Sequence, residues 1–294
     1  SPVEIAPDRN VFAGKVLITL ASKTPGVQIH YTTDGSEPTP ESPIYAKPFT
    51  LTKSTDVMAR AYRPGVTKNP PTQSGTEATV VSTAYFQEEN LTPPVTPTRP
   101  EAGLNVSYYE GDWNKLFMQF DDQKPLTSAK GVKLWDTSII PASNPFVEGK
   151  SGSRVKPYAL EYTGFLHIPA DGVYTLRAPH EYIWPATAAG YDLRVWLGNT
   201  IGKGVFAGRV VGKNEWYPAT TLHAFGTWSV ALQKGIHPFR VVFIDYRTES
   251  AKQFNFPGLN NYIWDGTTPK LMISGPDLPE QPIPASWLLR PLER

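Results

Sequence analysis

The segment of residues 27–39 places the strongest constraint on what this chain can fold into. Apolar and polar residues alternate from Val27 to Tyr31, and the run continues to an Asp-Gly pair, Asp34 and Gly35. A period of two puts the apolar side chains on one face of a β-strand, and a following Asp-Gly pair is a strong local signal for a hairpin turn. This segment therefore predicts a strand with one buried and one solvated face, as in an antiparallel sandwich.

Similar strand patterns recur along the chain, separated by proline and glycine. The 294 residues include 30 prolines and 23 glycines. Alternating apolar runs return at residues 16–20, 57–61, 193–197 and 239–243, whereas no amphipathic helix of three turns is recognisable. We therefore expect an all-β protein built from many short strands joined by turns.

Length and proline content together indicate two domains. A chain of 294 residues is long enough for two hydrophobic cores, and residues 93–100 contain four prolines. Proline runs favour an extended, semi-rigid spacer. The predicted divisions are a first domain at 1–87, a proline-rich linker at 88–102, a second domain at 103–275 and a C-terminal tail at 276–294. In the tail, Trp287 and Leu288 are expected to act as the anchor.

Composition argues against several classes of function. Lys and Arg number 28 against 27 Asp and Glu, a formal net charge of +1, so we expect no nucleic-acid partner. No run of 18 apolar residues is present, so we expect no membrane insertion. Cysteine is absent, which removes disulfides and Cys-based sites. No signal peptide precedes Ser1, so a mature product or a fragment is expected.

The first domain resembles the small β-sandwich found at the C-terminal side of chitobiases and β-hexosaminidases. The resemblance covers about residues 2–87. It rests on the Asp-Gly segment and on the motifs that follow it, which are Ser42-Pro43-Ile44-Tyr45, Pro48-Phe49 and Val57-Met58-Ala59-Arg60-Ala61-Tyr62. In that family the module is an appendage of polysaccharide-active proteins and performs no chemistry, so a non-catalytic sandwich is implied here.

The second domain is similar to a PA14 domain over about residues 103–275. The motifs that carry this resemblance are Gly103-Leu104 with Tyr108-Tyr109, Gly164-Phe165-Leu166-His167-Ile168-Pro169 with Gly172-Val173-Tyr174, the strand Asp192 to Leu197 ending in Gly198, and Leu232-Gln233-Lys234-Gly235. The resemblance implies a larger β-sandwich of a kind attached to glycosidases, adhesins and toxins, several of which bind glycans. The expected fold is thus two β-sandwich domains, the first of them small and Ig-like or fibronectin-like.

One loop of the second domain is rich in aromatic residues. Aromatic faces suit sugar rings because C–H groups stack on the ring while polar tips bond hydroxyls. The candidate glycan-binding residues are Tyr182, Trp184, Tyr191, Asp192, Trp196 and Asn199. The alternative for each aromatic side chain is packing at the end of the sandwich. Adhesin-type PA14 domains hold calcium with two adjacent aspartates, whereas this loop offers only Asp192, so no metal and no cofactor is expected.

No catalytic constellation is recognisable, and we expect this chain not to be an enzyme. Ordinary glycoside hydrolysis needs two carboxylates across a cleft, but the adjacent pair Asp121 and Asp122 would point to opposite faces of a strand unless it lies in a loop, and we expect a solvated turn before Gln123. The five histidines show no metal-ligand spacing, and no nucleophile elbow is present.

These observations predict a carbohydrate-binding or substrate-positioning region of a larger secreted polysaccharide-degrading protein. The resemblances imply a hexosaminidase-type glycosidase or a sulfatase as the parent, with an N-terminal catalytic domain in the same polypeptide, and an extracellular, periplasmic or cell-surface location. The alternative is a structural spacer, or a protein-interaction module of a surface adhesin, without affinity for sugar.

The lone Asp192 generates the first prediction, which concerns calcium. After chelation, the melting temperature of the chain is expected to stay the same when calcium is added in excess, because one carboxylate is a poor start for a calcium cage. Differential scanning calorimetry measures this directly. A rise of several degrees with calcium would contradict the prediction, since a ligand that binds only the native state must stabilise it.

Overall fold

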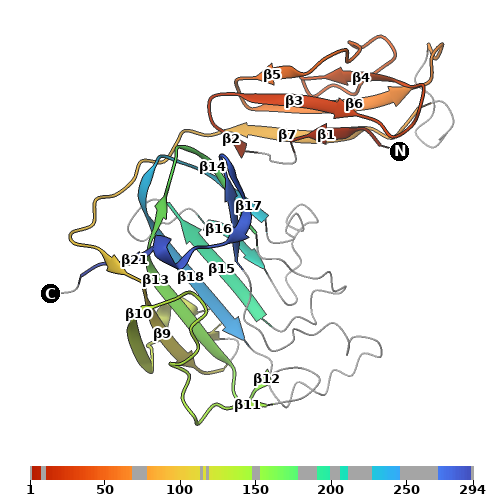
Figure 1. Cartoon of the computed structure of the whole chain (residues 1–294). Coiled ribbons are helices and arrows are strands. Elements are labelled where there is room, and N and C mark those ends of the chain that lie inside the picture. Colours follow the sequence, from red (N-terminus) through yellow and green to blue (C-terminus); the bar gives the residue numbers. More distant parts are fainter. Residues whose placement is uncertain are drawn as a thin grey trace. The chain divides into compact units, whose positions relative to one another are not determined.

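The computed structural model describes residues 2–7, 11–67, 78–112, 115–116, 119–147, 153–177, 191–198, 206–210, 227–245 and 271–292. The chain divides into two compact units, Ser1–Leu91 and Thr92–Arg294. Strands dominate both of them (Figure 1), so the expected all-β class is confirmed. The short 3-10 helices η1 (Phe120–Asp122) and η6 (Ala285–Trp287) interrupt the strands of the second unit.

The first unit is a sandwich of a three-stranded and a four-stranded sheet. The three-stranded sheet has the order β1 (Glu4–Ala6), β3 (Val16–Ala21), β5 (Phe49–Leu51), and the four-stranded sheet has the order β2 (Val11–Phe12), β7 (Ser82–Glu88), β6 (Thr55–Tyr62), β4 (Gln28–Thr32). The alternating residues Ile18 and Leu20 of β3 pack with Val57, Ala59 and Phe86 of the other sheet. Period-two alternation therefore builds this core, as the sequence predicts.

The Asp-Gly pair does form a turn after β4, although the chain returns over a longer loop than a tight hairpin. Gly35 has a φ of 80°, a left-handed conformation that glycine adopts without steric cost. The amide of Tyr31 donates to the Pro43 carbonyl at 3.0 Å, and the amide of Tyr45 donates to the Ile29 carbonyl at 2.8 Å. The strand partner of β4 beyond the turn is therefore a short segment near Pro43, and β6 pairs with the other edge.

The second unit is a larger sandwich of an eight-stranded and a four-stranded sheet (Figure 1). The eight-stranded sheet has the order β10 (Thr127–Val132), β9 (Leu104–Glu110), β13 (Tyr158–Ile168), β18 (Gly235–Asp245), β15 (Tyr191–Leu197), β16 (Phe206–Val210); β21 (Leu288–Arg290) pairs with β13, and β8 (Glu101–Ala102) pairs with β21. The four-stranded sheet has the order β17 (Thr227–Leu232), β14 (Gly172–Arg177), β19 (Met272–Gly275), β20 (Leu278–Pro282). A separate hairpin joins β11 (Phe146–Val147) and β12 (Ser153–Arg154).

The main core of this unit lies between its two sheets. Alternate residues of β18, namely Phe239, Val241 and Phe243, face that core together with Tyr174 of β14 and Ile273 of β19. The residues between them on β18 face the opposite side of the eight-stranded sheet, where a smaller buried cluster forms. The central strands are therefore covered on both faces. The alternating sequence pattern predicts one buried and one solvated face for each strand, so this prediction is wrong for the centre of the sheet.

The predicted linker and tail both belong to the second unit in part. The amide of Thr92 donates to the Ala231 carbonyl at 2.9 Å, and the amide of Val95 donates to the Ile236 carbonyl at 2.8 Å. Pro94 packs closely on Gly235, where an added Cβ would lie 2.6 Å from the Pro94 Cβ. The segment predicted as a spacer is therefore bonded to strands of the second unit from Thr92 onward.

The tail contributes a strand to each of the two sheets of the second unit. Strand β20 pairs with β19, and β21 pairs with β13 and with β8. Gly164 of β13 allows β21 to pair with β13, because a Cβ at this position would collide with the Leu289 carbonyl oxygen. Leu288 is 1% exposed within the main core, and Trp287 packs beside it, so these residues do anchor the tail. The second unit therefore includes residues before 103 and after 275. These residues join it through strand pairing, which sequence composition does not reveal.

The second prediction concerns this anchor. Replacing Leu288 by Ala is expected to lower the free energy of unfolding by about 2–5 kcal/mol, because it removes buried methyl groups and leaves a cavity. The matched control is Leu292→Ala, at a leucine that is 41% exposed in the same tail, and a change within about 0.5 kcal/mol is expected there. Urea unfolding of both variants measures the difference, and equal losses would show that β21 adds nothing to the core.

Candidate functional site

The described residues include part of the predicted glycan site. Tyr182, Trp184 and Asn199 lie outside the described residues. Tyr191 and Asp192 begin strand β15, and their backbone pairs with Asp245 and Ile244 of β18. Trp196 lies further along the same strand and is partly buried. Trp196 is therefore the predicted site residue whose side-chain contacts can be described.

Trp196 lies on the outer face of the eight-stranded sheet, opposite the main core. Its neighbours on β15, Val195 and Leu197, point into that core, so alternation turns Trp196 outward. It is paired across the sheet with Arg240 of β18, whose guanidinium carbon lies 4.6 Å from the centre of the indole ring. Residues directly opposite on neighbouring strands approach closely, which explains this cation–π contact.

Arg240 joins two carboxylates to this aromatic face. Its Nε donates to Glu161 Oε1 at 2.7 Å, and its Nη2 donates to Asp121 Oδ1 at 2.6 Å. Burial alone would lower the pKa of Arg240, but the hydrogen bond to Asp121 and the charges of Glu161 and Asp121 raise it instead. The guanidinium is therefore firmly charged and held in one orientation.

The second carboxylate oxygen of Glu161 also accepts a hydrogen bond. The hydroxyl of Tyr109 donates to Glu161 Oε2 at 2.6 Å, and burial together with this carboxylate raises the pKa of Tyr109. The Tyr109 ring packs on Phe120 with 4.8 Å between ring centres. The outer face thus carries a hydrogen-bonded network of an arginine, two carboxylates and a tyrosine beside an indole, which we call the Trp196 network.

The Trp196 network can present aromatic surface and charged hydrogen-bonding groups side by side. This combination suits a ligand that has both C–H faces and hydroxyl groups. Sequence reasoning missed Arg240, Glu161 and Tyr109. The alternation in β18 was a usable signal, because it places Arg240 on the face opposite Val241, but the partner strands were unknown.

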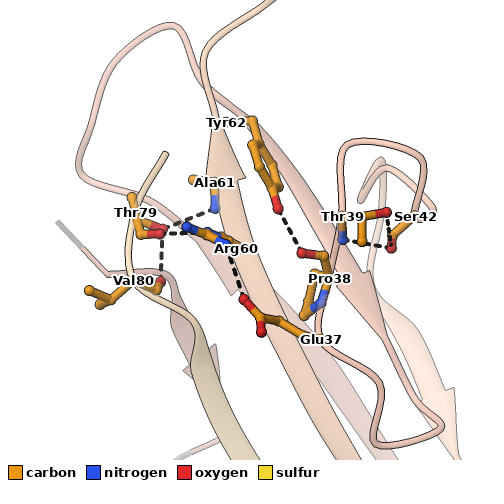
Figure 2. Close-up of polar contacts among 9 residues, drawn as sticks. All are labelled: Glu37, Pro38, Thr39, Ser42, Arg60, Ala61, Tyr62, Thr79 and Val80. Atoms are coloured by element: carbon orange, nitrogen blue, oxygen red, sulfur yellow. Dashed lines mark hydrogen bonds and ion pairs between the residues drawn. The ribbon is translucent and has the colours of Figure 1, made fainter. Parts of the chain in front are cut away.

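The first unit has a second polar cluster, on the outer face of β4 and β6 (Figure 2). Arg60 is only 3% exposed, and its Nε donates to the Thr79 carbonyl at 2.8 Å. Its Nη1 donates to Glu37 Oε1 at 3.1 Å, and the Tyr62 hydroxyl donates to the Pro38 carbonyl at 2.6 Å. The segment after the Asp-Gly turn is thus fastened over the strand face that sequence alternation assigns to solvent.

A shallow pocket lies beside this cluster. It has a volume of about 360 Å³ and is lined by Gly35, Glu37, Met58, Arg60, Val80 and Val81. Two charged side chains therefore meet apolar ones at one depression of the first unit. No site residue was predicted here, although the Asp-Gly segment and the 57–62 motif that supply its lining were the most distinctive of the chain.

Within the described residues, no three His, Cys, Asp or Glu side chains gather where a metal ion would be held. No helix within the same ranges is long and apolar enough to cross a membrane.

Residues 7–74 match the family model of the Chitobiase/beta-hexosaminidase C-terminal domain. The resemblance predicted for the first domain is confirmed over these residues, which carry both Glu37 and Arg60. No curated protein sequence matches the chain significantly.

Among solved structures, an anti-sigma factor domain-containing protein has 12% identity and a TM-score of 0.34, with 90% of this chain and 79% of that chain covered. The Epithelial Adhesin 6 A domain from Candida glabrata, solved in complex with Galb1-3GlcNAc, has 10% identity and a TM-score of 0.38, with 69% and 93% covered. An anti-sigma factor domain-containing protein from Clostridium clariflavum has 13% identity and a TM-score of 0.30, with 90% and 80% covered. Because these TM-scores lie below 0.5, none of the three likenesses bears on function.

The third prediction compares the two carboxylates that Arg240 holds. Glu161→Gln is expected to cost about 1.5–3 kcal/mol of unfolding free energy, because charged hydrogen bonds from Arg240 and Tyr109 are both weakened. Asp121→Asn is the matched control, since Asp121 is 76% exposed and exposed ion pairs contribute less than about 1 kcal/mol. Urea unfolding at neutral pH checks both variants, and an equal cost would mean that Glu161 does not organise the network.

Proposed function

We propose that this chain is a non-catalytic carbohydrate-binding or substrate-positioning region of a larger secreted polysaccharide-degrading protein. The observation that carries the proposal is the match of residues 7–74 to a domain named for its place at the C-terminal end of chitobiases and β-hexosaminidases. A hexosaminidase-type glycosidase or a sulfatase is the proposed parent, with a catalytic domain in the same polypeptide. An extracellular, periplasmic or cell-surface location follows from that parent.

The second unit is proposed to be a PA14-like domain that contacts glycan. The order of its sequence motifs supports this assignment, and those motifs fall on strands of one sandwich. Gly172 and Tyr174 lie on β14, and Gly235 begins β18. The proposal adds a sugar-binding role to this fold, which the fold alone does not imply.

The Trp196 network is the part of this unit that best suits a sugar. An indole next to a fixed guanidinium and carboxylates offers a stacking surface together with donors and acceptors for hydroxyls. Strand β15 begins with Tyr191 and Asp192; in the sequence, Tyr182 and Trp184 precede this strand and Asn199 follows it. On this sequence proximity, Tyr182, Trp184 and Asn199 are kept in the proposal as candidate glycan-binding residues.

The fourth prediction tests this function with the intact chain on a glycan array that includes chitin, cellulose and xylan fragments. Binding to at least one neutral glycan is expected. Trp196→Ala is expected to weaken it at least tenfold, about 1.4 kcal/mol, because a central aromatic contact is lost. Trp196→Phe is the matched control, since it keeps an aromatic face and is expected to retain most of the affinity.

Melting curves of the wild type and both variants accompany the titrations, which are made well below the melting midpoint. Absence of binding across the array would favour the spacer or protein-interaction alternative. Binding that is indifferent to Trp196 would remove the Trp196 network from the proposed site while the carbohydrate-binding function stands.

A further inference from the structure

The pocket of the first unit has two walls that are each held by hydrogen bonds. On one side, the Asp34 carboxylate accepts from the Ser36 amide at 3.0 Å and from the Ser36 hydroxyl at 2.6 Å, which fixes the turn that carries Gly35 and Glu37. On the other side, the Thr79 amide donates to the Ala61 carbonyl at 2.8 Å, which fixes the segment that carries Val80 and Val81. The depression is therefore part of the folded unit and needs little ordering before it binds a ligand.

The pocket lining combines apolar side chains with two charged ones. Met58 lies on β6 opposite Thr83, on the outer face of the sheet. Val80 is 58% exposed and lines the pocket together with the buried Arg60. Arg60 and Glu37 form the polar part, with the ion pair visible at the centre of Figure 2.

The charges of Arg60 and Glu37 indicate what kind of ligand fits. The pair is neutral as a whole, so a bare anion would meet the Glu37 carboxylate and a cation would meet the guanidinium. Arg60 Nη1 donates to Glu37 Oε1 at 3.1 Å, and both residues line the pocket. The Glu37 side chain is 52% exposed beside the Arg60 guanidinium, so a charged acceptor next to a charged donor group borders the pocket, which suits the hydroxyl groups of a neutral sugar.

Size and surroundings agree with this ligand. A volume of about 360 Å³ lies near the lower end of the range of roughly 300–1,000 Å³ that small-molecule pockets occupy, so one ring is accommodated and not a long chain. Tyr85 of β7 lies opposite Asp56, two residues along β6 from Met58 and on the same sheet face. It is 48% exposed, so its ring is available to a second sugar unit that leaves the pocket.

We propose that this pocket binds one pyranose unit of a neutral glycan, with two adjacent hydroxyls between Glu37 and Arg60 and a C–H face on Met58 and Val80. The inference rests on the proposed function, and it assigns to the first unit a sugar contact of its own, separate from the Trp196 network. The first unit is then a binding module and not only a spacer.

The fifth prediction uses a signal that reports on this pocket alone. The chain has three methionines, and Met58 belongs to the first unit while Met118 and Met272 belong to the second. With the full chain labelled at its methionine methyl groups, a glycan that binds on the array is titrated and followed by NMR. The Met58 signal, assigned with Met58→Leu, is expected to shift in a saturable manner.

Paired variants then test the polar contacts. Glu37→Gln is expected to weaken the Met58 titration roughly tenfold, because a charged acceptor is lost. Glu41→Gln makes the same chemical change at an exposed residue outside the pocket lining, and no change in affinity is expected. Val80→Ala is expected to weaken binding at least threefold, whereas Leu17→Ala, at a leucine 56% exposed on β3, leaves it unchanged.

The outcomes separate this inference from the function on which it rests. A glycan that binds the array and leaves the Met58 signal unmoved overturns the pocket while the carbohydrate-binding function stands. A Met58 shift that Glu37→Gln and Glu41→Gln affect equally also overturns it, since the ion pair would then play no part. No binding to any array glycan rejects the proposed function and the pocket together.

Discussion

The pairing of β13 with β18 is the interaction on which the second unit depends. Eleven residue pairs, from Tyr158↔Asp245 to Ile168↔Gly235, join the two strands in one unbroken antiparallel register. One face of this pair carries the main core and the other carries the smaller buried cluster around Ile244. A slip by one residue would exchange the two faces and place Arg240 in the core, so the register is strongly determined. Strands β9, β15 and β21 all attach to this central pair.

Each unit places a charged arginine on the outer face of a sheet and surrounds it with the same kinds of partner. Arg60 is held by Glu37, the Thr79 carbonyl and the Tyr62 ring, whereas Arg240 is held by Glu161, Asp121 and the Trp196 ring. Removing a guanidinium from water is costly unless its donors are used, which explains why both arginines have fixed acceptors. Both arrangements leave charged groups beside apolar or aromatic side chains at the protein surface. That shared chemistry is why sugar contacts are proposed in both units.

Function in such sandwiches depends on side chains and not on the fold, since the same architecture serves many unrelated roles. The family match of residues 7–74 links the first unit to polysaccharide-active proteins, and the outer-face residues are what would turn this association into binding. Both polar clusters lie on strands or on turns fastened to strands, so their geometry is set by strand pairing. Ligand contacts built on such elements are better preorganised than contacts built on a free loop.

The sequence by itself determined the all-β class, the turn at Asp34 and Gly35 and the inward-facing residues such as Ile18 and Val241, because these follow from local alternation and turn chemistry. It also placed Trp196 on the face opposite Val195. Only the tertiary structure decided what covers that outer face, because Arg240, Glu161 and Tyr109 come from strands that are distant in sequence. The same holds for the buried Arg60, for the pairing of β8 with β21 and for the bonds of Thr92 to the second unit. Strand partners are chosen by long-range pairing, and a pattern of period two shows which side chains share a face but not which strand or segment will lie against it.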